Sequence, residues 1–330
     1  MKYCAVVFLC SLLLSLAAGY VALPILKKLH VSQTINELGP QTHMGKQGIP
    51  TMGGISFLCA GLLCGLAFGF RYKNTNGQLM LYCAACTLCF ALIGFLDDYL
   101  KVVKGRSVGL TVKQKFAPQI LFALVFSLIA YSSKSINTAF AMPFTDTHLD
   151  IGVFFIPVMT FIMVAVDNSA NILDGLDGLL SGNGSIALFF YAIYMYYEVS
   201  KTGNGSLMNT GIFCLCMSAA LFAFLKLNAH PARVFMGDVG SLGIGGALAG
   251  AAAVSGTSLM LPFMLVTMLI SSLSDILQVL YMRRHKGRKL LRMSPLHHHL
   301  ELGGMPENHV FTLYNIITLV GCAAAFILFA

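Results

Sequence analysis

Long stretches without a charged side chain recur along the whole 330-residue chain. A helix needs about 18–20 apolar residues to cross the hydrocarbon core of a bilayer. The runs that reach this length are 3–26, 47–70, 74–96, 116–133, 178–197 and 202–225, and run 151–166 is slightly shorter. Only helices and closed barrels satisfy every backbone hydrogen bond inside lipid, and runs this long favour helices. The pattern predicts an all-α, polytopic membrane protein.

Two further apolar regions complete the set of spans. The run 239–274 is too long for one crossing, and the segment 255–258 with Pro262 supplies a break, so it predicts two helices, the second continuing to about Leu280. A last span covers about 310–330. We therefore expect ten transmembrane helices in a single integral membrane domain, residues 1–330. With 57% hydrophobic and 10% charged residues, a soluble fold of this size could not bury the apolar surface.

The basic residues are distributed unevenly between the two sides that ten spans define. Both termini fall on one side, which holds only Lys2, Arg71, Lys73, Lys134 and Lys201 out of 21 Lys and Arg. Loops rich in Lys and Arg stay in the cytoplasm. We therefore expect both termini outside and the alternate loops inside. The net charge of +8 reflects this topology and does not indicate a nucleic-acid partner.

The first concentrated polar motif follows the apolar run 74–96. Asp97 and Asp98 end this run, and Lys101 follows within a turn. If the helix continues past the acids, Lys101 shares a face with both of them. Adjacent carboxylates repel and hold water, and they oppose the positive-inside bias. We predict a site for a cation and phosphate oxygens here, with a stop signal at the membrane edge as the alternative.

A second polar segment, residues 167–179, reads DNSANILDGLDGL. It contains three acids, two asparagines and no basic residue, and its apolar residues keep it near the membrane surface. Asp174 and Asp177 would share one face of a helix, with Asn171 one turn earlier. The spacing of a calcium-binding EF-hand is absent. We predict a ligand-binding segment, and a polar loop with two tight glycine turns is the alternative.

A third segment, residues 228–241, reads NAHPARVFMGDVGS. Asp238 lies at the predicted start of a helix, where a carboxylate can bind a metal while backbone N–H groups face an anion. Phe235 is suited to stacking on a base or sugar ring. An N-terminal helix cap and a phenylalanine at the lipid interface are the alternative interpretation.

The remaining candidates lie in the first and fifth cytoplasmic loops and in the ninth span. Lys46 is a candidate phosphate ligand, and it precedes the string PTMGG at 50–54. The fifth loop contains three consecutive histidines, residues 297–299, which can bind metal, donate to phosphate or act as acid and base. Asp275 lies about two turns before the end of its span. An acid at that depth is a functional candidate, although contact with a nearby serine also explains it.

The ten cysteines all fall in or beside apolar spans. Cys83, Cys86 and Cys89 have no histidine or fourth cysteine nearby, so we interpret them as packing residues between membrane helices, with no disulfide framework. Carboxylates and lysines on one side, with no P-loop, zinc-type ligand set or Ser-His-Asp arrangement, favour Mg²⁺ and phosphate chemistry. The sequence predicts one active-site cleft where the cytoplasmic loops converge.

In combination these motifs resemble the bacterial phospho-N-acetylmuramoyl-pentapeptide transferase family, within the polyprenyl-phosphate N-acetylhexosamine-1-phosphate transferases. The resemblance covers essentially the full length. It rests on PTMGG at 50–54, Asp97-Asp98 with Lys101, the segment ending DGLDGL, FMGD at 235–238 and the three histidines. The histidines and PTMGG are similar to the muramoyl branch rather than the GlcNAc-1-phosphate branch.

The resemblance implies an Mg²⁺-dependent enzyme of the bacterial plasma membrane that works as a homodimer. Its reaction would couple UDP-MurNAc-pentapeptide to undecaprenyl phosphate, releasing UMP. Asp238 resembles the metal ligand, Asp97 or Asp98 would deprotonate or orient the lipid phosphate, and His298 is a further catalytic candidate. The implied substrate-binding residues are Lys46, Thr51, Lys101, Lys115, Asn168, Asn171, Asp174, Asp177, Asn228, Phe235, His297 and His299.

Within this set, the resemblance implies that Lys46 and Lys115 offer charge to phosphates. The residues that look like the uridine and sugar side are Asn171, Asp174, Asp177 and Phe235. The histidines would contact the diphosphate or the sugar-peptide. Two alternatives remain. A paralogue would use UDP-GlcNAc, and an ion-coupled transporter would use Asp275 and the loop carboxylates as an ion path.

Overall fold

Helices form nearly all regular structure in the computed structural model, which describes residues 2–29, 31, 46, 48–72, 77–104, 109–145, 147–203 and 205–330. Nine helices within these ranges are long and apolar enough to span a membrane, and one bent pair supplies a tenth crossing. This confirms the predicted all-α, polytopic fold. The long helices are α1 (Lys2–Lys28), α2 (Gly54–Arg71), α3 (Gln78–Lys104), α4 (Val112–Ser132), α5 (Phe155–Leu173), α6 (Leu179–Thr202), α7 (Ser206–Asn228), α8 (Gly237–Ser255), α10 (Val266–Arg284) and α12 (Glu307–Phe329).

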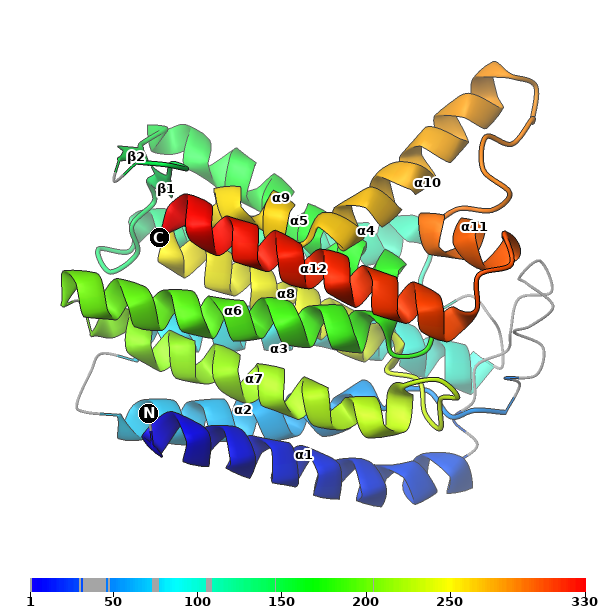
Figure 1. Cartoon of the computed structure of the whole chain (residues 1–330), viewed down its shortest axis with the longest axis horizontal. Helices are drawn as coiled ribbons and strands as arrows, with labels where there is room; N and C mark the ends of the chain where they lie inside the picture. Colours follow the sequence, from blue (N-terminus) through cyan, green and yellow to red (C-terminus); the bar gives the residue numbers. More distant parts are fainter. Residues whose placement is uncertain are drawn as a thin grey trace.

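The long helices stack side by side, and both chain termini lie at the same end of the bundle (Figure 1). Helix α7 packs against α1, α2 and α6, and α12 packs against α6. An even number of crossings requires the two termini to share an end. The polar loops that carry the predicted site meet at the other end, near the short helix α11 (Leu296–Leu302).

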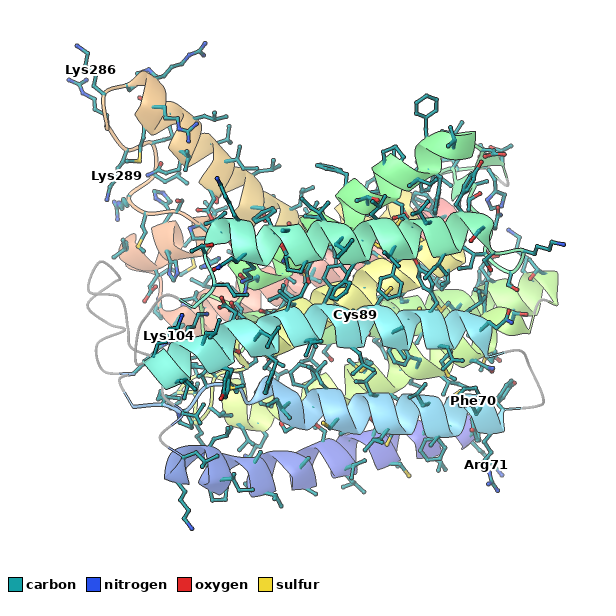
Figure 2. All side chains as sticks on the ribbon, turned by 180° about the vertical axis from the view of Figure 1, so that it is seen from behind. Phe70, Arg71, Cys89, Lys104, Lys286 and Lys289 are labelled. Carbon is teal, nitrogen blue, oxygen red and sulfur yellow. The ribbon has the colours of Figure 1, made fainter. Side chains whose placement is uncertain are left out.

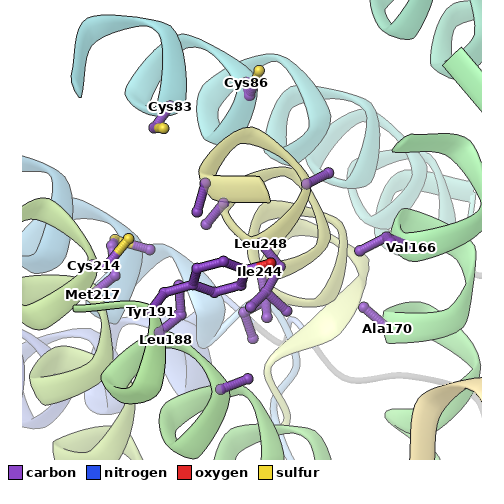
Figure 3. Packing of buried hydrophobic residues seen from close by; sticks show 14 of the residues in the cluster. Cys83, Cys86, Val166, Ala170, Leu188, Tyr191, Cys214, Met217, Ile244 and Leu248 are labelled. Carbon is purple, nitrogen blue, oxygen red and sulfur yellow. The ribbon is translucent and has the colours of Figure 1, made fainter. Parts of the chain in front are cut away.

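Helix α8 forms the centre of the bundle. Its sequence is rich in glycine and alanine, and nearly all of its residues from Val239 onward are buried. Small residues let membrane helices approach closely. Figure 3 shows Ile244 and Leu248 of α8 between residues from α3, α5, α6 and α7. On α3, the free thiols of Cys83 and Cys86 are fully buried in this packing, as we expected for cysteines between membrane helices.

The predicted break after α8 is present, but the next span is not straight. Helix α8 ends at Ser255, and a 3₁₀ turn η3 (Ser258–Met260) leads into the four-residue α9 (Leu261–Met264). Pro262 lies in the first turn of α9, where a missing N–H is tolerated. The chain then bends by 81° between the η3–α9 segment and α10. Helix α10 therefore leaves the bundle obliquely (Figure 1).

The segment between α4 and α5 contains a two-stranded antiparallel sheet. Strands β1 (Phe140–Ala141) and β2 (His148–Leu149) pair with Phe140 opposite Leu149. The Ala141 N–H donates to the Gly256 carbonyl, 2.8 Å away, so this sheet is attached to the break after α8. The single-turn η2 (Gly152–Phe154) then leads into α5.

Candidate active site

Asp97 and Asp98 lie near the end of α3, which continues to Lys104 instead of stopping at the acids. Lys101 therefore faces both, with its Nζ 2.6 Å from Asp97 Oδ2 and 3.6 Å from Asp98 Oδ1. Both carboxylates are buried. Each also accepts a hydrogen bond from a backbone N–H of another segment, from Leu110 to Asp97 and from Val239 to Asp98. Buried charges persist when paired and hydrogen-bonded in this way, so the acids belong to an organised polar site.

Asp238, in the first turn of α8, brings a third carboxylate to this pair. Its Oδ2 accepts hydrogen bonds from Lys101 (3.1 Å) and from Lys115 on α4 (2.8 Å). Its Oδ1 accepts a hydrogen bond from the Asn171 amide (3.0 Å), and Lys115 also donates to Asn171. Four helices, α3, α4, α5 and α8, therefore meet at one carboxylate.

Two glycines allow the backbones around Asp238 to come together. A Cβ at Gly94 of α3 would lie 2.6 Å from the Val239 nitrogen and closer still to the Asp238 carbonyl. Gly237 has φ +72°, and a Cβ there would lie 2.9 Å from Thr51 Oγ1. The Thr51 hydroxyl is buried and has no hydrogen-bond partner among the described residues. Only residues without a side chain fit at these two contacts.

The three carboxylates have the composition of a cation site. One oxygen each from Asp97, Asp98 and Asp238 can be chosen so that all lie within 4.8 Å of one another. A donor set made only of carboxylate oxygens suits a hard cation such as Mg²⁺, which completes its shell with water and phosphate oxygens. Lys101 and Lys115 lie against the same acids. The residues present therefore fit a divalent cation held together with anionic substrate groups.

A cavity of about 310 Å³ opens beside Asp238. This is at the small end of the range for small-molecule sites. Phe235 lines it with a partly exposed ring, and Asn228 is held in its wall by hydrogen bonds with Ser181 and the Val234 carbonyl. The lining residues are Lys46, Asn171, Asp174, Gly175, Leu176, Asp177, Asn228, Phe235, Gly237 and Asp238.

The segment 167–179 is partly helical, and one prediction about it is wrong. Helix α5 continues to Leu173, so Asn171 is helical, but Asp174 and Asp177 lie in the turn before α6 and do not share a helical face. The glycines at 175 and 178 favour this turn over a continued helix. Burial, with the negative charges of Asp238 and Asp98, raises the pKa of Asp174 above its ordinary value.

Lys46 belongs to a second charged cluster at the far side of the cavity. Its Nζ lies 2.7 Å from both Asp177 Oδ1 and Glu307 Oε1. Glu307, at the start of α12, also accepts a hydrogen bond from the Asp177 N–H (2.7 Å). His230 Nδ1 lies 3.2 Å from Asp177 and 3.1 Å from Glu307. We interpret this cluster as an ion-pair network, because the Lys46 ammonium already bridges the Asp177 and Glu307 carboxylates.

Two of the three histidines lie beside the cavity wall, and the third does not. His297 is fully buried on α11, and the Nε2 atoms of His297 and His298 lie close to Gly175 in the cavity wall. His298 Nδ1 is 3.2 Å from Glu301. His299 instead accepts a hydrogen bond from the Arg292 N–H (3.0 Å). The structure thus brings His297 and His298 to Gly175 in the cavity wall, although neither lines the cavity, and it directs His299 to the Arg292 backbone.

A polar layer lies one helical turn deeper than Lys115 and Asn171. Gln119 donates to Asp167 Oδ2 (2.6 Å), and Asn168 donates to Gln119 Oε1 (3.1 Å). Asp167 and Gln119 are fully buried. Asn168, predicted to bind substrate, therefore lies behind the cavity and does not line it.

Sequence reasoning did not select Asp167, Gln119, His230 or Glu307 as site residues. Asp167 and His230 stand inside the segments 167–179 and 228–241 but were not singled out there, whereas Gln119 and Glu307 are isolated polar residues in or at the start of a helix. The one signal for Gln119 is its position four residues after Lys115, which places both on one helix face. The signal for Glu307 is that it is an acid at the start of the last span, on the same side as the other motifs.

Comparison with known proteins gives a consistent result. Residues 80–256 match the family model described as glycosyl transferase family 4. The chain is 38% identical to the phospho-N-acetylmuramoyl-pentapeptide-transferase of Listeria welshimeri serovar 6b over 91% of this chain and 90% of the relative. It is also 38% identical to the proteins of the same name from Shouchella clausii, over 94% and 93%, and Thermoanaerobacter sp. strain X514, over 96% and 95%. The chain therefore belongs to the phospho-N-acetylmuramoyl-pentapeptide-transferase family.

Proposed function

We propose that the chain transfers phospho-MurNAc-pentapeptide from UDP-MurNAc-pentapeptide to undecaprenyl phosphate, which gives lipid I and UMP. The observation that carries this proposal is the meeting of Asp97, Asp98 and Asp238 with two lysines beside a polar cavity. These groups lie at one end of an apolar bundle, where a soluble nucleotide and a membrane lipid can both be reached. Relatives that match nearly the whole chain carry the corresponding name.

The cavity is suited to the nucleotide end of the donor. Phe235 offers a ring face for the base, while Asn228 and Asp174 offer polar groups in the same wall. The diphosphate would then extend toward Asp238, where Lys115 supplies positive charge. His297 and His298, beside Gly175, would contact the diphosphate or the sugar-peptide as it leaves the cavity.

An apolar groove of about 220 Å³ offers a place for the lipid acceptor. It lies between α5 and the η3–α9–α10 segment, with Val166, Pro262 and Met268 among its lining residues. Ser169 of α5 lines the groove, and Asn171 of the same helix lines the polar cavity. We propose that the prenyl chain occupies the groove, so that its phosphate reaches the carboxylates at the end of the bundle.

In the reaction, an oxygen of the lipid phosphate forms a bond to the sugar-bearing phosphorus, and the bond from that phosphorus to UMP breaks. In this one-step route Asp97 or Asp98 accepts the proton of the lipid phosphate or orients it. In the alternative two-step route an aspartate carboxylate first bonds to that phosphorus and displaces UMP, and the lipid phosphate then displaces the carboxylate. Lys101 and Lys115 neutralise charge on the phosphates, since phosphoryl transfer depends on positioning and electrostatic stabilisation. When bound by Asp238 and the neighbouring carboxylates, Mg²⁺ would neutralise charge on the diphosphate.

The same proposal includes the placement of the enzyme in the cell. The basic loops and the site share one side, so we propose that the site faces the cytoplasm and that both termini lie outside a bacterial plasma membrane. We also propose a homodimer, which mass measurement in native-like nanodiscs would test.

The decisive assay is UMP release by the purified protein in detergent with UDP-MurNAc-pentapeptide and undecaprenyl phosphate. We expect release that needs both the lipid and Mg²⁺, and that falls by at least on the order of 10²-fold in Asp97→Asn, Asp98→Asn and Asp238→Asn. Full activity in all three folded variants would contradict the assignment. Activity with UDP-GlcNAc alone would assign the chain to the paralogous branch. No UMP release with either donor, together with solute uptake by the wild-type protein that is lost in Asp275→Asn, would favour the transporter.

A further inference from the structure

Helix α10 is exposed to its surroundings on several sides. After the 81° bend it leaves the bundle, and only Thr267, Met268, Ser271, Ser274 and Gln278 are buried along it. Its apolar side chains between 269 and 280 remain 39–55% exposed, and they are Leu269, Ile270, Leu273, Ile276, Leu277, Val279 and Leu280. Exposed aliphatic side chains in such number are stable in contact with acyl chains and unstable in water. The exposed apolar side of α10 is therefore suited to contact with lipid acyl chains.

The far end of α10 carries a dense positive charge, which we call the basic tip (residues 283–292). The basic tip contains no Asp or Glu, and its basic residues are all exposed; they are Arg283, Arg284, Lys286, Arg288, Lys289 and Arg292. Figure 2 shows Lys286 and Lys289 at the end of the projecting helix, directed away from the bundle. None of these basic residues lines the cavity beside Asp238.

The basic tip has a defined conformation. The Leu290 and Leu291 N–H groups donate to Gln278 Oε1 (3.1 and 2.9 Å), and Gln278 Nε2 donates to the Leu291 carbonyl (3.2 Å). Farther along, the Leu296 N–H donates to Ser274 Oγ (2.8 Å). The chain after α10 is thus folded back along the helix. The Arg292 guanidinium donates to the Leu302 carbonyl at the end of α11 (2.8 Å), and the other basic residues of the tip are exposed around the turn that follows α10. Leu290 is 50% exposed beside them.

We propose that the basic tip binds the headgroups of anionic phospholipids in the leaflet on the active-site side. The apolar body of α10 places the tip at the level of the headgroups, where long basic side chains extend their charges to the interface. Clustered Lys and Arg next to a membrane helix are attracted to anionic lipids, and an adjacent exposed leucine adds apolar contact. The positive-inside rule alone concerns only the side of the membrane, whereas this surface selects a class of lipid.

The chain contains no tryptophan, so a single introduced tryptophan reports its own surroundings. Leu290→Trp places the probe in the basic tip, and Leu13→Trp places it on the exposed face of α1, where Leu13 is 62% exposed. Each variant is reconstituted into vesicles that contain the same fraction of either phosphatidylglycerol or phosphatidylcholine brominated near the headgroup. We expect Leu290→Trp to be quenched at least about twofold more by the anionic lipid, and Leu13→Trp to be quenched equally by both.

Two charge-matched variants complete the test. When Lys286→Gln and Lys289→Gln are added to Leu290→Trp, the ratio of quenching by phosphatidylglycerol to quenching by phosphatidylcholine should fall toward one. Lys27→Gln with Lys28→Gln removes the same charge from the last turn of α1 and should leave the preference unchanged. Equal quenching of Leu290→Trp by the two lipids, no quenching by either, or an equal response to both charge pairs would overturn the proposal. Because the signal does not depend on turnover, its failure is distinguishable from failure of the proposed transferase activity.

Discussion

Adding one methyl group at Gly94 tests whether the close contact between α3 and α8 sets the geometry of the carboxylates. In Gly94→Ala, the new Cβ would lie 2.6 Å from the Val239 nitrogen, whereas ordinary contacts begin at 3.4 Å. The contacting groups, the Asp238 carbonyl and the Val239 nitrogen, belong to the backbone and cannot rotate away. Helices α3 and α8 must therefore separate by about 1 Å. A displacement of that size within a reacting group can lower the rate on the order of 10²-fold. We therefore expect kcat to fall by about that factor.

The assay is UMP release at saturating donor and lipid, together with donor binding by calorimetry. The cavity lining does not include Gly94, so the donor Kd should change by less than about threefold. Gly184→Ala is the matched control. Its Cβ would lie 3.0 Å from the Cδ2 methyl of Leu221 and 3.1 Å from the Cγ2 methyl of Ile244, so these side chains need to give by only a few tenths of an ångström. If Gly94→Ala kept the kcat of Gly184→Ala, the distance between α3 and α8 would not control the reaction.

Three further predictions follow from the contacts around the cavity. Glu307→Gln removes one charged partner of Lys46, so the KM for the donor should rise on the order of tenfold with little change in kcat, as initial-rate kinetics will show. Asp167→Leu leaves the Gln119 amide without its acceptor beneath the site and should lower kcat on the order of tenfold. Asp167→Asn keeps an acceptor, so its kcat should stay within about threefold of wild type. His298→Ala should lower kcat/KM at least on the order of tenfold. His299→Ala should change kcat/KM less than about threefold, because His299 accepts a hydrogen bond from the Arg292 backbone. Similar losses in both variants would contradict the assigned orientations.

The spans could be predicted from the sequence because their signal is strong and local. Uncharged runs of bilayer length have few other stable structures, and an even number of them places the termini together. The helix ends could not be predicted in the same way. Helix α3 continues past Asp97 to Lys104, since a helix does not have to stop where the hydrocarbon ends. The angle at Leu265 was also unpredictable, because hydrophobic periodicity contains no information on how two segments meet.

The candidate site could be predicted where its residues form compact motifs. Asp97, Asp98, Asp238 and Phe235 stand in short polar strings that interrupt apolar sequence, and the structure brings them to one end of the bundle. The helical face predicted for Asp174 and Asp177 was wrong because glycine preferences outweighed the spacing of the acids. Gln119 and Glu307 were missed because their importance lies in partners more than 40 residues away, Asp167 and Lys46.

The departure of α10 at Leu265 has a consequence for kinetics. With the prenyl chain in the groove between α5 and the η3–α9–α10 segment, as proposed above, the acceptor would arrive by diffusion in the plane of the membrane, without leaving the bilayer. Its availability is then set by its mole fraction in the leaflet. The donor arrives from water, and its availability is set by concentration in volume. Diluting the membrane with inert phospholipid at a constant total amount of acceptor should therefore slow turnover, whereas diluting the vesicles in buffer at a constant donor concentration should not.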